Sequence, residues 1–374
     1  MTAPPARNDV GGAGNPSRAT AKTAFTALYD YVVERLGGTA ATATSGEQDT
    51  ACTAIGAVRK TGDAMTGNLN VPSINGGQLA GFRNVLINGG MQINQEGLTS
   101  VADDTYCLDQ WYVLTETGNV TVAQQTDQEN GTPFNIRLTQ PDVTAKQIGL
   151  AQIIEASSSK PLRAKTATLA ARIRCSASTQ INYAVLEWTG TADAVTSDVI
   201  SSWSGSPTYI GSITERAKGS ITPAAATWTD APGLNAAINA STNNLIVLIW
   251  SNTDLAQNVT LDIGRAQLEP GTVATPFEHR PVAVEQALSQ RFYQMADWLV
   301  STYASVGSQD YYGVVNFPVR MRALPTAVKS GGVFTNSTDP GAASISASRY
   351  SAFARSVAAG PLYASYTVVA SARL

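Results

Sequence analysis

The sequence predicts a mainly β protein in which an N-terminal helix and an extended neck precede two β domains. From about Asn84 onward, short strand-like runs are separated by Gly, Pro, Asn and Ser, which is the pattern of a sandwich or barrel. No long amphipathic helix interrupts these runs. The 374 residues are enough for two or three compact units. We therefore expect a β-sandwich followed by a smaller β domain.

The composition is globular and excludes several classes of function. Apolar residues make up 43% of the chain and charged residues only 14%, which favours extensive contact between subunits. The net charge is −3 and no basic run occurs, so the chain lacks the clustered cations of a general nucleic-acid binder. No apolar stretch has the length of a signal peptide or a membrane span. We expect a soluble protein that is made in the cytoplasm.

The three cysteines do not predict a disulfide framework or a metal site. Cys52, Cys107 and Cys175 are odd in number and widely spaced, which fits neither paired disulfides nor a zinc site built from CxxC pairs. Cys175 falls on the apolar side of the alternating run 169–175. We interpret all three as small buried hydrophobic residues.

Residues 1–45 are predicted to form an extended arm and one helix. Apolar residues recur at three- and four-residue steps before a glycine pair ends the pattern. This stripe packs either on its own chain or in a short parallel bundle on a trimer axis. Only the bundle explains why so little nearby sequence is available to cover it. The residues assigned to this trimer and anchor helix are Phe25, Leu28, Val32 and Leu36.

Residues 46–83 are predicted to be an intertwined neck, because their apolar positions are separated by Gly, Asn and Pro and cannot form a core alone. Residues 84–282 are predicted to form a jelly-roll-like antiparallel β-sandwich. Within it, the unbroken apolar run Leu245–Trp250 indicates a strand buried on both faces. Trp111 also lies in an apolar run and is assigned, with Trp250, to the core.

Residues 283–374 are predicted to form the smaller distal β domain. A short helix is expected over Pro281–Gln294, at the start of this domain. Prolines and arginines around Phe317–Pro318 indicate an edge or bent strand. The alternating segment 362–374 predicts a terminal strand.

Several phrases of the sequence resemble bacteriophage tail fibres that carry a carbohydrate-binding-module-like jelly-roll domain. The phrase Met65–Val71 resembles a recurring shaft motif, and Asn84–Gln95 with Asp109–Trp111 resembles the opening of the jelly-roll domain. Gly264–Glu278 resembles its closing strand. The phrases Gln290–Tyr293 and Phe317–Thr326 resemble the distal domain that follows in the same fibres.

This resemblance implies a homotrimeric virion protein that is made in the host cytoplasm. Its N-terminus would attach to tail or baseplate proteins, and its β domains would recognise a host surface glycan or receptor. It implies no cofactor, no nucleic acid, no membrane insertion and no catalysis. Three other functions stay open: a purely structural tail adaptor or fibre base, a glycan depolymerase, and a secreted glycan-binding module, which the absent signal peptide disfavours.

The residues do not predict a catalytic or metal site. The single histidine, His279, has no nearby partner that would complete a triad or a metal site. The pair Asp103-Asp104 is read as a solvated turn, because adjacency in sequence does not give the separation that glycoside hydrolysis requires. The glycines at 11, 12 and 14 lack the lysine of a phosphate-binding loop. We therefore expect no enzyme.

Aromatic residues among polar neighbours are the candidates for receptor contact. Sugars present apolar C–H faces that stack on aromatic rings, and exposed aromatics are typical of binding surfaces. For each of them, packing or a subunit interface is the alternative interpretation. The candidates are Trp188, Trp203, Tyr209, Trp298, Tyr303, Tyr311 and Tyr312.

Overall fold

The computed structural model describes residues 81–126, 132–203 and 207–374. The chain divides into two compact units, Met1–Val71 and Pro72–Leu374, and every described residue belongs to the second. The predicted N-terminal arm, Cys52 and most of the predicted neck lie outside the described residues. So do the predicted helix residues Phe25, Leu28, Val32 and Leu36.

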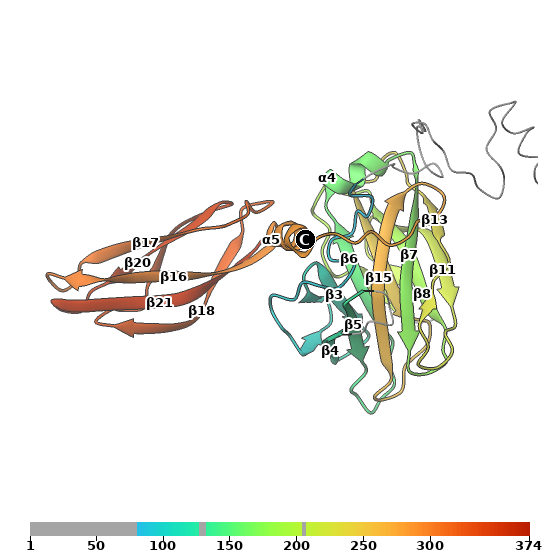
Figure 1. The fold of residues 1–374 in the computed structure, drawn as a ribbon, viewed down its shortest axis with the longest axis horizontal. Helices are drawn as coiled ribbons and strands as arrows, with labels where there is room; N and C mark the ends of the chain where they lie inside the picture. The colour runs from blue at the N-terminus through green and yellow to red at the C-terminus, as the bar shows by residue number, and fades with distance from the viewer. Residues whose placement is uncertain (1–80, 127–131, 204–206) are drawn as a thin grey trace, which may run out of the picture. The chain divides into compact units, whose positions relative to one another are not determined.

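The first β region is an antiparallel sandwich of two sheets (Figure 1). Sheet I has the strand order β1-β4-β5-β15-β7, with β12 and β13 both paired to β7. Its strands are β1 (Ser100–Ala102), β4 (Asn119–Thr126), β5 (Phe134–Thr139), β7 (Thr166–Cys175), β12 (Thr229–Asp230), β13 (Leu234–Ala237) and β15 (Thr260–Pro270).

Sheet II has the strand order β11-β8-β14-β6-β3-β2, and all its pairings are antiparallel. The chain passes repeatedly between the two sheets, at β1 to β2, β3 to β4, β5 to β6, β6 to β7, β7 to β8, β11 to β12, β13 to β14 and β14 to β15. Its strands are β2 (Thr105–Leu108), β3 (Trp111–Thr115), β6 (Ile148–Ile154), β8 (Ile181–Trp188), β11 (Ile213–Ile221) and β14 (Asn244–Ser251).

The main core lies between these sheets and confirms several expectations. In β14 every residue is buried: Leu245, Val247 and Ile249 enter the core between the sheets, and the alternate residues enter a layer on the other face of sheet II. Trp111 is fully buried. Cys107 and Cys175 are buried free thiols, and burial raises the pKa of Cys107 to about 12, so its thiol stays protonated and apolar in character.

Short helical segments lie at the edge of the sandwich. Helix α4 (Ala156–Ser159) and the 3₁₀ turn η2 (Lys160–Leu162) follow β6. Helix α5 (Val282–Gln290) is the predicted short helix, but it ends before Gln294 because the chain turns into a strand at Tyr293. The buried Glu285 of α5 accepts hydrogen bonds from the Asn88 amide at 2.7 Å and from Arg280 at 3.1 Å, which fixes the helix on the sandwich.

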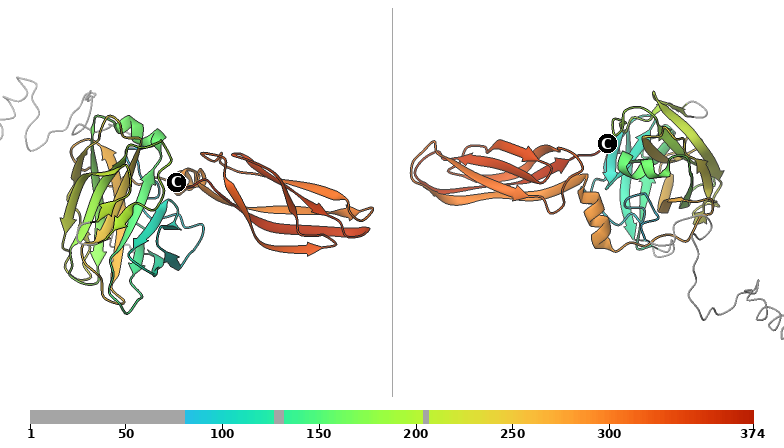
Figure 2. Two further views of the ribbon diagram at one scale, coloured as in Figure 1. Left: turned by 180° about the vertical axis from the view of Figure 1, so that it is seen from behind. Right: turned by 90° about the horizontal axis from the view of Figure 1, so that it is seen from above.

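The C-terminal β region contains two three-stranded antiparallel sheets (Figure 2). Sheet III has the order β16-β21-β18, with β16 (Tyr293–Ala304), β18 (Thr326–Thr335) and β21 (Gly360–Ser371). Sheet IV has the order β17-β20-β19, with β17 (Asp310–Asn316), β19 (Gly341–Ser346) and β20 (Arg349–Arg355).

A second, separate core belongs to these two sheets, and Trp298, Tyr350 and Tyr366 are its largest side chains. The predicted terminal strand is present as β21. The expected edge or bent strand at Phe317–Pro318 is wrong, because the chain has no regular structure from Phe317 to Pro325. Phe317 itself is buried and anchors this segment on the core.

Candidate functional site

Three of the predicted aromatic residues come together on the outer face of sheet II. That face carries a continuous apolar layer that includes Tyr112, Leu248 and Trp250. A segment made of residues 189–203 and 207–212, here called the cover segment, buries Val195 and Val199 in the same layer. The rings that pack at its margin are those of Trp188, Trp203 and Tyr209.

Local contacts show that two of these rings serve packing. The indole nitrogen of Trp188 donates to the Thr191 carbonyl at 2.8 Å, and a Cβ at Gly190 would lie 2.4 Å from the Trp188 ring. Only glycine therefore lets the chain cross that ring so closely. The hydroxyl of Tyr209 donates to Glu215 at 2.8 Å, and burial together with this carboxylate raises the pKa of Tyr209.

A group of carboxylates lies beside the same layer. Burial, together with the charges of Asp103 and Asp198, raises the pKa of Asp104 to about 6. Within the described chain, the buried hydroxyl of Tyr112 and the buried indole nitrogen of Trp250 have no hydrogen-bond partner. The outer layer is thus a second packed surface of the sandwich, and it contains two buried polar atoms without a partner among the described residues, which is costly. Among the described residues, no group of His, Cys, Asp or Glu is arranged to hold a metal ion.

The C-terminal aromatics separate into buried and exposed residues. Trp298 has 0% exposure and stacks on Tyr366 with ring centroids 4.8 Å apart, so its prediction as a receptor contact is wrong. It points inward because its strand alternates, and Gly313 leaves room for its ring on the facing sheet. Tyr311 is half-buried against the same core, and its hydroxyl donates to Gln309 at 2.8 Å.

Tyr303 and Tyr312 are the exposed members of the predicted set, at 69% and 65% of their full surface. They lie on different sheets, Tyr303 on the outer face of sheet III and Tyr312 on that of sheet IV. Tyr312 pairs across the strands with Phe353, and the ring centroids lie 5.7 Å apart. Gly341 sits opposite Phe353 on the next strand, where a Cβ would approach the Phe353 ring to 2.7 Å.

The neighbouring row of sheet IV supplies polar groups beside these rings. Arg355 donates two hydrogen bonds, of 2.6 and 2.9 Å, to the two carboxylate oxygens of Asp310. These bonds lower the pKa of Asp310, so the carboxylate stays ionised in mild acid. We call this set, Asp310, Tyr312, Phe353 and Arg355, the Tyr312 face. Sequence reasoning missed all of it except Tyr312, since the strand pairing that joins residues 310–312 to 353–355 is not visible in the sequence.

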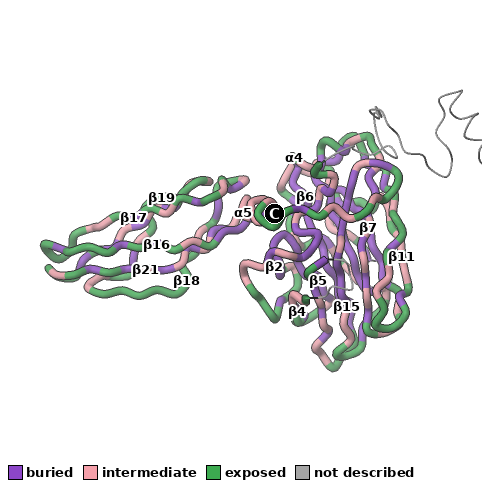
Figure 3. Tube along the Cα trace, in the orientation of Figure 1, coloured by how far each residue is buried: buried purple, intermediate pink, exposed green. Residues whose placement is uncertain are grey.

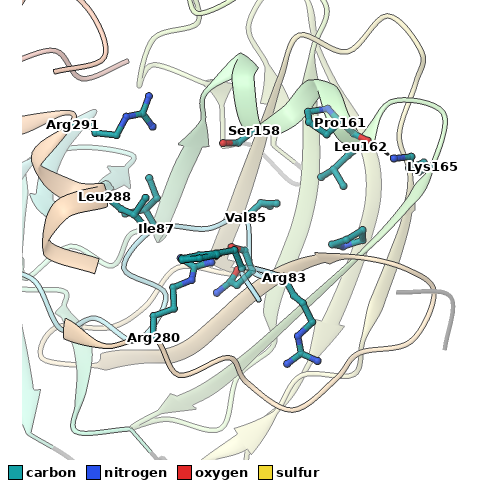
Figure 4. Close-up of a pocket in the computed structure, with 13 residues that line it drawn as sticks. Arg83, Val85, Ile87, Ser158, Pro161, Leu162, Lys165, Arg280, Leu288 and Arg291 are labelled. Atoms are coloured by element: carbon teal, nitrogen blue, oxygen red, sulfur yellow. Dashed lines mark hydrogen bonds between the residues drawn. The ribbon is translucent and has the colours of Figure 1, made fainter. Parts of the chain in front are cut away.

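A hollow of about 430 Å³ lies where the segment 83–87 passes between α4 and α5 (Figure 4). Its lining includes the apolar side chains of Val85, Ile87, Leu162 and Leu288. Arginines stand around them: Arg280 and Arg291 pair with Glu285 and Glu155, and Arg83 donates to a backbone carbonyl. The cations are therefore already engaged, and the hollow suits an apolar side chain better than a sugar.

Comparisons with known proteins give distant structural likenesses only. No family model matches the chain, and no curated protein matches it. The carbohydrate-binding module TmCBM61, solved with β-1,4-galactotriose, has 14% identity and a TM-score of 0.32, over 50% of this chain and 99% of its own. The family 22 carbohydrate-binding module of Clostridium thermocellum Xyn10B has 10% identity and a TM-score of 0.30, over 50% of this chain and 100% of its own.

Tailspike protein 4 of bacteriophage CBA120 has 11% identity and a TM-score of 0.32, over 50% of this chain and 21% of its own. Likenesses at these TM-scores do not place the chain in a family.

Proposed function

We propose that this protein is a non-enzymatic subunit of a bacteriophage tail fibre that recognises a glycan on the host surface. The observation that carries the proposal is the Tyr312 face, where exposed Tyr312 packs on half-buried Phe353 beside a carboxylate and a guanidinium that are joined by two hydrogen bonds. The N-terminal region would attach to the tail or baseplate, and the copies would form a homotrimer, as the sequence resemblance implies.

The chemistry of the Tyr312 face fits a sugar. An aromatic ring offers an apolar surface to the C–H groups of a pyranose, while Asp310 accepts and Arg355 donates hydrogen bonds to neighbouring hydroxyls. Since the two charged groups are already paired, neither has to be ordered when the sugar binds. The aromatics at the cover segment are less suitable, because they are half-buried in the layer they cover.

Binding without cleavage is supported by the same arrangement. Most glycoside hydrolases use two carboxyl groups that flank the scissile bond. Among the residues of the Tyr312 face, Asp310 is the single carboxylate, and it is tied to Arg355. A homotrimer would add avidity, because three weak sites on one particle act at high effective concentration.

The experiment is a titration of the full-length protein with surface polysaccharide from the host, measured per site by calorimetry. Tyr312→Ala should weaken binding about tenfold or more, which corresponds to the loss of one well-placed aromatic contact. Leu324→Ala is the control, because Leu324 is exposed to a similar extent, at 68%, but lies outside both sheets of this region. Equal losses in both variants, or release of reducing sugar by the wild type, would refute the proposal.

A purely structural adaptor is the second candidate, and the hollow beside α5 favours it. Its apolar lining, including Ile87 and Leu288, would accept an apolar side chain of another virion protein. In that case the full-length protein would bind purified tail proteins but not host polysaccharide. Leu288→Lys would then abolish the protein contact, whereas Tyr312→Ala would leave it intact.

A further inference from the structure

The outer face of sheet III is an exposed apolar surface. Register aligns the outward side chains in rows across its three strands, for example Leu299 with Ser365 and Val333. Six apolar or aromatic residues of this face are exposed at 40% or more: Met295, Leu299, Tyr303, Val328, Val333 and Tyr363.

This concentration is unusual within the described chain. Of the 17 large hydrophobic residues that are exposed, 12 belong to residues 293–374, although that region is much shorter than the sandwich. Half of these 12 lie on the one face of sheet III. Single exposed hydrophobic residues scattered over a surface are normal, but these residues align in rows and form one contiguous apolar patch. A contiguous patch of this kind marks an interaction site.

The face is nearly free of charge. Its single residue that is charged at neutral pH is Asp297, whose carboxylate accepts a hydrogen bond from the Thr367 hydroxyl at 2.9 Å. The strand register places Lys329 of β18 among the inward residues, so it does not belong to the outer face. Its ammonium group pairs with Asp339 at 2.6 Å. An anionic membrane surface would require cations, which the outward residues of this face do not supply.

The margin of the face is an open strand edge. Strand β18 pairs with β21 only, and nine of its ten residues are exposed, as Figure 3 shows in green along β18. A bulge between Ser330 and Val333 opens a hollow of about 460 Å³ that Leu299 and Tyr363 also line. Natural monomers protect such edges with charges or prolines, and this strand has one lysine and no proline.

We propose that the outer face of sheet III packs against the same face of neighbouring copies of this chain, with the three faces of the homotrimer turned towards its three-fold axis. Two identical faces are complementary when they are apolar and almost uncharged, because no like charges then oppose each other. The hollow at the bulge gives an apolar side chain of the neighbouring copy a place to insert. The inference rests on the homotrimer of the proposed function and adds the surface through which the copies meet.

The test combines the mass of the full-length protein by light scattering with hydroxyl-radical footprinting of its side chains. In the wild type, Met295 and Tyr363 should be labelled several-fold more slowly than Tyr312, although all three are exposed in the single chain. Val333→Glu should restore their labelling by placing like charges at the contact. Val314→Glu is the matched control, since Val314 is a similarly exposed strand valine on sheet IV.

The outcomes separate this surface from the rest of the proposal. A wild-type protein that is a monomer would overturn both the homotrimer and this contact. An oligomer in which Met295 and Tyr363 react as fast as Tyr312 would overturn this contact alone. Protection that persists in Val333→Glu would also overturn it. Glycan binding at the Tyr312 face is measured per site and is independent of all three results.

Discussion

Asp262 on β15 is held by Arg137 through two hydrogen bonds of 2.7 and 2.9 Å, and its carboxylate is almost completely buried. Arg174 of β7 adds a third hydrogen bond to the same carboxylate at 2.7 Å. The three residues form one row across sheet I. We expect Asp262→Ala to lower the free energy of unfolding of the sandwich by about 3 kcal/mol, because two guanidinium groups lose their shared partner.

The measurement is amide hydrogen exchange of β15 in wild type and variant. Asp230→Ala is the control on the same sheet, since Asp230 approaches Arg172 only to 3.8 Å and is 73% exposed. That change should cost less than about 0.5 kcal/mol, as exposed ion pairs do. Equal effects of the two substitutions would show that burial of Asp262 does not determine how much its ion pairs stabilise the sandwich.

The outer layer of sheet II should behave as a core. Leu248 is fully buried beneath the cover segment, so Leu248→Ala should destabilise the sandwich by about 2–5 kcal/mol through lost contacts and a residual cavity. Val143→Ala, at a residue that is 86% exposed, should change stability by no more than about 0.5 kcal/mol. Chemical denaturation measures both. A small effect at Leu248 would mean that the cover segment leaves this face open to solvent.

The sequence predicted best those strands whose surroundings are uniform. The run Leu245–Trp250 is apolar throughout because both faces of β14 are covered. Its burial could therefore be predicted without deciding which of its residues face the core. The mainly β, antiparallel architecture followed from many short runs of this kind. The α5 helix was also predicted, and only its end was misplaced.

The prediction failed where both sides of a strand are apolar. In β16, Trp298 faces the core and Leu299 faces outward, and alternation alone cannot say which of two adjacent apolar residues is inside. Tyr311 and Tyr312 in β17 present the same ambiguity. The exposed apolar face of sheet III is the physical reason, because it removes the polar residues that normally mark the outside of a strand.

The raised pKa of Asp104 predicts a pH-dependent stability. Its pKa rises from 3.8 to about 6 on folding, so folding favours the protonated carboxyl, and this stabilising contribution is lost as pH rises through about 6. Asp104→Asn removes the ionisation and should raise the melting temperature at about pH 8 but not at about pH 4.

Thermal unfolding of wild type and variant across this pH range measures the difference. Asp254→Asn is the control, since Asp254 is an exposed carboxylate on the loop after β14. It should shift the melting temperature little at either pH. A gain from Asp104→Asn that is the same at both values of pH would rule out ionisation as its cause.

Arg355 should determine affinity at the Tyr312 face through its geometry as well as its charge. The planar guanidinium of Arg355 binds both carboxylate oxygens of Asp310, so Arg355→Met should weaken glycan binding about tenfold. Arg355→Lys should weaken binding as well, because a lysine ammonium cannot make both hydrogen bonds in this geometry. Arg349→Met is the control, because Arg349 is exposed further along the same strand and outer face.

The same pair predicts how binding depends on pH. The hydrogen bonds from Arg355 lower the pKa of Asp310 below its usual 3.8. The ion pair is therefore fully formed above pH 3.8, and it is lost only when the pH falls through the lowered pKa of Asp310. Affinity measured by calorimetry should therefore stay constant from about pH 8 to about pH 5. A decline within that interval would mean that a group other than Asp310 controls recognition, and the assignment of the Tyr312 face would have to be abandoned.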